Sequence, residues 1–142
     1  KDKITSIKKA IEKRNAQHDV WGWKYPRSNV YLKDISSELI NPMLICVFRD
    51  VVASTARGVV RRREEPLDSI RRALDLQSSN LRLIEQSNLP TLLVSYEKAI
   101  ADPLQLVTSL NRFMLLGLSP DQLATHAGKV NPELGYGASN VR

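Results

Sequence analysis

The stretch "MLICVFRDVVASTARG", residues 43–58, joins a continuous apolar run to a helical pattern without an intervening loop. The apolar run has the length of a strand, and such a run is typical of a central strand that is covered on both faces. Arg49 and Asp50 end the run, and the apolar residues after them recur on one side of a helix, for which Asp50 is a good N-cap. A strand that leads directly into a helix favours an α/β fold.

Further strands and helices are predicted on both sides of this stretch. The β-branched and aromatic runs "VWGWK" (20–24) and "TLLVSY" (91–96) indicate strands. Helices are expected at Ile4, Ile7 and Ile11, over residues 29–40 and 67–87, after Asp102 with Gly117 as its C-cap, and after Ser119. This alternation predicts one domain, residues 1–142, with a parallel sheet flanked by helices and a loop-like tail over residues 128–142.

Composition limits the classes of partner. The chain has 142 residues, a net charge of +6 and a pI near 9.7, which fits an anionic partner such as nucleic acid, a membrane surface or a phosphorylated ligand, or only solvated basic faces. No apolar run approaches the roughly 18 residues of a membrane span. The single cysteine, Cys46, indicates a reducing compartment such as the cytoplasm. His18 and His126 lack companions at ligand spacing, so no metal site is expected.

Polar residues lie at the end of each of the three predicted strands. Lys24 and Arg27 lie at the end of the first strand, Arg49 at the end of the second, and Tyr96-Glu97 at the end of the third. In open parallel sheets, ligands bind beyond the carboxyl ends of the strands. These residues therefore mark the expected binding edge.

Arg49 lies where a phosphate site is expected. The first N–H groups of a helix lack intrahelical partners, and the helix dipole adds partial positive charge to the fork of donors on Arg49. Ser54 and Thr55, about one turn into the helix, would add hydroxyl donors. In the alternative interpretation, Arg49 pairs with Asp50, Glu97 or another carboxylate.

Trp21 and Trp23 alternate with Gly22, so they are expected on one face of the first strand. We expect them to pack in the core, while an aromatic platform for a base is the alternative. The run "RRREE" (61–65) is expected to be an exposed helix face, although basic runs also bind nucleic acid.

Three segments in this order resemble the PAPS-dependent sulfotransferase family, and bacterial-type members in particular. PAPS is 3′-phosphoadenosine 5′-phosphosulfate. The segments are "VWGWKYPRS", "ICVFRDVVAS" and "LLVSYEKAIADPLQLVTSLNRFMLLGL", and the resemblance covers residues 20–118. It implies a P-loop-nucleotide-kinase-like sulfotransferase fold that transfers a sulfuryl group from PAPS to a hydroxyl or amine of a small-molecule, glycan or lipid acceptor.

The resemblance also implies roles for particular residues. Arg49 matches the arginine that binds the 3′-phosphate of PAPS. Ser54 or, in an ungapped alignment, Arg57 matches the serine of the following helix, and Arg27 is a further candidate cofactor ligand. Lys24 matches the lysine that approaches the transferring sulfuryl group, whereas Pro26 stands where some relatives carry a histidine base.

The family's phosphosulfate loop precedes everything that matches here, so the resemblance implies that these residues are the later part of a longer protein. Two other functions stay open. One is a basic module that binds nucleic acid, although no specific nucleic-acid partner is expected. The other is a sulfotransferase relative that kept the fold and lost catalysis.

Overall fold

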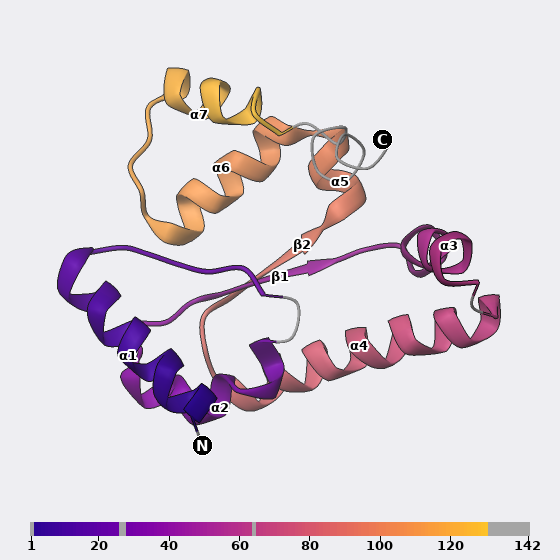
Figure 1. Ribbon diagram of the computed structural model, residues 1–142. Coiled ribbons are helices and arrows are strands. Elements are labelled where there is room, and N and C mark those ends of the chain that lie inside the picture. The colour runs from indigo at the N-terminus through magenta and orange to yellow at the C-terminus, as the bar shows by residue number, and fades with distance from the viewer. Residues whose placement is uncertain (1, 26–27, 64, 131–142) are drawn as a thin grey trace, which may run out of the picture. The chain divides into compact units, whose positions relative to one another are not determined.

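The computed structural model describes residues 2–25, 28–63 and 65–130 (Figure 1). The helices are α1 (Asp2–Gln17), α2 (Leu32–Ile35), α3 (Val51–Arg62), α4 (Pro66–Ser87), α5 (Tyr96–Ala101), α6 (Pro103–Met114) and α7 (Pro120–Ala127). The strands are β1 (Leu44–Phe48) and β2 (Thr91–Ser95), and short 3₁₀ helices occur at η1 (Ser28–Val30) and η2 (Ser36–Glu38). The chain divides into two compact units: unit 1 holds residues up to 44 together with 75–91, and unit 2 holds residues 45–74 and those from 92 onward.

The core of unit 1 forms where α1 packs against α2. Ile11 of α1 is buried together with Leu32 and Ile35 of α2. Ile4 and Ile7 pack against this cluster, as the predicted apolar face of the first helix requires. The helix expected over residues 29–40 is confirmed as three short turns, η1, α2 and η2.

The prediction of a strand over residues 20–24 is wrong, because this segment is irregular in the structure. The two indole rings stack on each other, with centroids 5.6 Å apart and planes at 30°. Each ring donates its N–H, Trp21 to Oδ1 of Asn15 at 3.0 Å and Trp23 to the hydroxyl of Tyr31 at 3.2 Å. These side-chain contacts fix the segment, so the β-propensity of its residues does not decide its backbone.

Core packing is confirmed for only one of the two tryptophans. Trp21 is half-buried and packs against the Ile11 cluster. Trp23 keeps 44% of its surface exposed, so the expectation that it is a core residue is wrong. Its N–H donates to the hydroxyl of Tyr31, so the polar edge of the ring is hydrogen-bonded while part of the ring stays at the surface.

β1 and β2 are neighbours in a small parallel sheet of two strands, as far as the described residues go. The mixed α/β class is therefore confirmed, while the predicted third strand is not formed. β1 is also not covered on both faces. Its burial alternates, and Ile45 and Val47 remain 44% and 55% exposed. An apolar run thus does not show whether a strand has cover on one face or on two.

The helices of unit 2 begin at the capping residues that the sequence predicts. The carboxylates of Asp50 and Asp102 accept the N–H groups of Ala53 and Gln105. Ser119 and Gln122 form a reciprocal capping box at the start of α7. The sequence pattern does not predict α5, which begins directly after β2 and has Ser95 as its N-cap.

The C-cap predicted at Gly117 is wrong, because α6 ends at Met114 and its C-cap is Leu115. Leu115 adopts the left-handed conformation, with φ 54°. Asn111 holds this turn: its backbone carbonyl accepts from Leu116 N at 3.1 Å and its side chain accepts from Leu118 N at 3.0 Å. Because of these contacts, the left-handed C-cap of α6 lies two residues before Gly117.

Among the described helices, none is both long and apolar enough to cross a membrane. The tail predicted over residues 128–142 falls outside the described residues from 131 onward, as do the side chains of Arg61 and Arg62 and all of Glu64 in the "RRREE" run.

Candidate anion-binding site

Arg49 and Tyr96 meet at the carboxyl ends of β1 and β2 in unit 2. Arg49 directly follows β1, and Tyr96 directly follows β2. The guanidinium carbon of Arg49 lies 4.4 Å from the centroid of the Tyr96 ring. A guanidinium stacked on an aromatic face keeps its in-plane N–H donors at the edge of the stack, where they can bind an anion. The structure thus brings together two of the three predicted strand ends.

Glu97 ties the end of β2 to the start of α3. Its Oε1 accepts the backbone N–H of Asp50 at 2.9 Å, and its Oε2 accepts the hydroxyl of Ser95 at 3.4 Å. The N–H of Asp50, the backbone of Glu97 itself, Ser95 and the charge of Arg49 together hold the pKa of the Glu97 carboxyl below its ordinary value. Glu97 is therefore ionised at neutral pH and adds negative charge beside Arg49.

The N-terminus of α3 uses several of its own donors. Oδ1 of Asp50 accepts from Ala53 N at 2.6 Å, and the backbone carbonyl of Asp50 accepts from Ser54 N at 2.9 Å. The hydroxyl of Ser54 donates to the carbonyl of Val51 at 2.9 Å, and that of Thr55 to the carbonyl of Val52 at 3.0 Å. Either hydroxyl would have to leave its helical carbonyl before it could donate to a phosphate.

Three predicted site residues, Lys24, Arg27 and Arg57, are not described together with Arg49. Lys24 is exposed and belongs to unit 1, whereas Arg49 belongs to unit 2, so their joint site remains a prediction. Arg27 lies outside the described residues. Arg57 lies in α3, but its side chain is not among those described. In the described part of the chain, no group of His, Cys, Asp or Glu is arranged to hold a metal ion.

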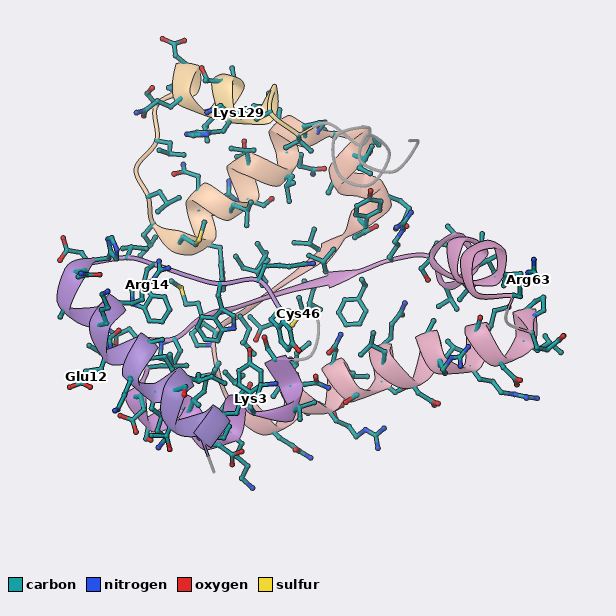
Figure 2. All side chains as sticks on the ribbon, in the orientation of Figure 1. Lys3, Glu12, Arg14, Cys46, Arg63 and Lys129 are labelled. Atoms are coloured by element: carbon teal, nitrogen blue, oxygen red, sulfur yellow. The ribbon has the colours of Figure 1, made fainter. Side chains whose placement is uncertain are left out.

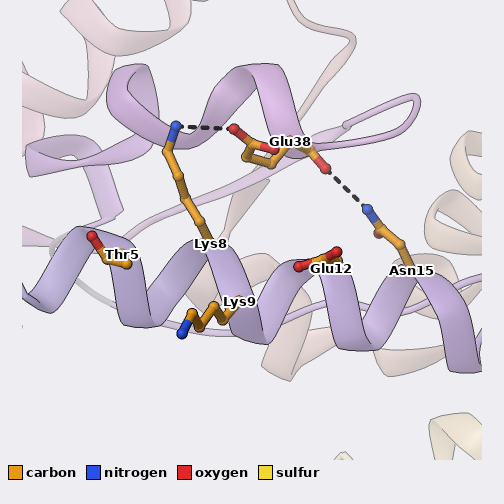
Figure 3. A pocket seen from close by; sticks show the side chains of 6 residues that line it. All are labelled: Thr5, Lys8, Lys9, Glu12, Asn15 and Glu38. Atoms are coloured by element: carbon orange, nitrogen blue, oxygen red, sulfur yellow. Dashed lines mark hydrogen bonds and ion pairs between the residues drawn. The ribbon is translucent and has the colours of Figure 1, made fainter.

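A second polar region lies along α1 in unit 1. A groove of about 380 Å³ is lined there by Thr5, Lys8, Lys9, Glu12, Asn15 and Glu38 (Figure 3). Lys8 and Glu38 form an ion pair at 2.9 Å, and Asn15 donates to the backbone carbonyl of Glu38 at 3.0 Å. The hydrogen bond from Lys8 lowers the pKa of Glu38. These contacts join α1 to η2, and an ion pair this exposed adds little stability.

Sequence reasoning missed the contacts that position the aromatic side chains. Asn15 and Tyr31, which hold Trp21 and Trp23, carry no pattern that marks them as partners. The bond from Asp50 N to Glu97 joins residues 47 positions apart, a distance that local spacing cannot reveal.

Comparison of the chain with protein-family models, with curated proteins and with solved structures finds no match.

Proposed function

We propose that this chain is part of a PAPS-dependent sulfotransferase, with the P-loop-kinase-like fold of that family. It would transfer the sulfuryl group to a hydroxyl or amine of a small-molecule, glycan or lipid acceptor. One observation carries the proposal: Arg49 directly follows β1, lies next to Asp50, the N-cap of α3, and is stacked on Tyr96 after β2. The guanidinium of Arg49 therefore lies near a helix N-terminus at the carboxyl edge of a parallel sheet, which is a common position for phosphate sites.

The proposed role of Arg49 is to bind the 3′-phosphate of the nucleotide. A guanidinium binds phosphate through two parallel N–H···O bonds, which fix orientation as well as charge. Tyr96 supports one face of the guanidinium. Ser54, Arg57 and Arg27 are proposed to supply further donors to the same nucleotide.

Lys24 is proposed to act at the sulfuryl group. Bound PAPS would supply the sulfuryl group, and Lys24 would hold its ammonium charge beside the oxygens of that group. A lysine charge beside the transferring group stabilises the negative charge that develops in the transition state. Such a charge acts mainly on kcat.

A second candidate is a sulfotransferase relative that kept the fold and lost catalysis. Two carboxylates, Asp50 and Glu97, lie at the start of α3, and both accept backbone N–H groups there. This negative charge would weaken the binding of a phosphate at the helix N-terminus. Weak nucleotide binding and no sulfuryl transfer by the folded full-length protein would favour this candidate.

The proposal is tested by calorimetry on the full-length protein with three nucleotides. Adenosine 3′,5′-bisphosphate should bind about 1.5–3 kcal/mol more tightly than AMP, because one charged phosphate contact is worth about that much. Adenosine 2′,5′-bisphosphate has the same charge and serves as the control for the position of the second phosphate. Its affinity should exceed that of AMP by less. Equal affinity for all three nucleotides would remove the proposed 3′-phosphate site.

A further inference from the structure

Unit 1 contains a pocket of about 250 Å³ that the proposed cofactor site does not use. Its walls are mostly apolar and aromatic, and they come from α1, from the irregular segment after α1 and from α2 with the residue before it. Ile11 and Ile35 of the buried core form part of its lining. Trp21, Trp23 and Tyr31 supply aromatic surface.

The aromatic wall is fixed before any ligand binds. The indoles of Trp21 and Trp23 stack on each other, and each N–H is held by a different partner, Asn15 or Tyr31. Trp23 nevertheless keeps 44% of its surface exposed. Gly22, between them, also lines the pocket, and a Cβ added there would meet nothing within 4 Å. A rigid aromatic surface with open space beside it can accept a flat ring at low entropic cost.

The pocket has a cationic side. Arg14, which Figure 2 labels, lies in the last turn of α1 and is exposed. It lines the pocket. Among the described residues that line it, Arg14 is the only charged one. An anion on a bound ring would therefore meet a cation and no opposing carboxylate in the lining.

We propose that this tryptophan-lined pocket binds a flat aromatic ligand that carries an anionic group. The ring packs against Trp21 and Trp23, and the anion pairs with Arg14. The pocket shares no residue with the proposed cofactor site, so this inference stands independently of the sulfotransferase proposal.

Intrinsic fluorescence can test the pocket directly, because the chain has 2 tryptophans and both line it. The full chain is titrated with benzoate, with benzyl alcohol, which is aromatic but neutral, and with cyclohexanecarboxylate, which is anionic but not aromatic. Benzoate should change the fluorescence saturably and bind about two- to tenfold more tightly than either of the other two. No saturable change, or equal affinity for benzoate and cyclohexanecarboxylate, would overturn the proposal.

Variants on α1 separate the contributions of charge and space. Arg14→Gln should reduce the affinity for benzoate to that for benzyl alcohol and leave the affinity for benzyl alcohol unchanged. Ala10→Leu, which adds bulk to the lining, should abolish the binding of benzoate, whereas Ala16→Leu, at an exposed position of the same helix outside the lining, should not. Helix content by circular dichroism confirms that each variant folds. Unchanged benzoate binding in Arg14→Gln or in folded Ala10→Leu would contradict the assignment.

Discussion

At the scale of single residues, the Tyr96 ring supports Arg49 by contact with the face of its guanidinium, at 4.4 Å from the centroid. A cation–π contact of this kind contributes about 0.5–1 kcal/mol at a partly exposed site. Tyr96→Leu should therefore lower the free energy of unfolding by about that amount more than Tyr96→Phe, which keeps the ring. Urea unfolding of both variants measures the difference, and equal loss in the two would mean that the ring face contributes nothing.

Glu97 gives a prediction for pH dependence. Its pKa is lowered from the ordinary 4.5, mainly by the N–H of Asp50, so its stabilising contribution is present above pH 4.5 and is lost as the pH falls through the lower folded value. Glu97→Gln keeps an oxygen acceptor but removes this titration.

The measurement for Glu97 is urea unfolding at several pH values below neutrality. The wild type should lose stability relative to Glu97→Gln as the pH falls below about 4.5. Glu85→Gln, at an exposed position on α4, serves as the control and should follow the wild type more closely. Parallel pH profiles for wild type and Glu97→Gln would argue against the bond to Asp50.

The sequence predicts that Arg49, Tyr96 and Glu97 lie at one edge of the sheet, but it does not predict which contacts they make there. A position at the end of a strand can be read from an apolar run, so Arg49 and Tyr96-Glu97 are expected at one edge. Which partners Arg49 contacts depends on tertiary packing, which places its guanidinium against the ring of Tyr96. Packing likewise leaves Trp23 at the surface, although its residue type favours burial.

At the scale of elements, the end of α6 allows a test in which glycine at one position should raise the stability of the protein and glycine at the next position should lower it. Leu115 is 87% exposed and has a left-handed backbone, which costs a residue with a Cβ about 1–2 kcal/mol relative to glycine. Glycine also adds about 0.4–1 kcal/mol of unfolded-state entropy. Leu115→Gly should therefore stabilise the protein by roughly 0.5–1 kcal/mol.

Leu116→Gly is the matched control. Leu116 is 40% exposed and is not among the residues with positive φ, so glycine there should only destabilise. Thermal unfolding of both variants shows whether each substitution raises or lowers the melting temperature. A lower melting temperature for Leu115→Gly would show that the left-handed turn carries no strain.

Helix starts are predictable at this scale because capping is local. Asp50, Asp102 and Ser119 each act within three residues of their own position. Strands are less predictable, because a strand needs a neighbour that the local sequence does not contain. The segment 20–24 has strand composition but finds side-chain partners on α1 and next to α2 instead, and so remains irregular.

At the scale of the whole molecule, the sequence correctly predicts a mixed α/β chain with a parallel sheet, yet the sheet in the described residues has two strands. Ile45 and Val47 of β1 and Leu93 of β2 stay exposed on it. The alternation of strands and helices predicts the class because it depends on chain order. It does not predict how many strands pair, since that depends on long-range contacts.

The central claim is that Arg49 recognises the 3′-phosphate of the donor nucleotide. The most direct test is a thermodynamic cycle in which the full-length wild type and Arg49→Ala are each titrated calorimetrically with adenosine 3′,5′-bisphosphate and with AMP. Arg112→Ala, which removes an exposed arginine of α6, controls for the loss of general positive charge. The preference for the bisphosphate should shrink by about 1.5–3 kcal/mol in Arg49→Ala and stay unchanged in Arg112→Ala. An unchanged preference in Arg49→Ala would contradict the account.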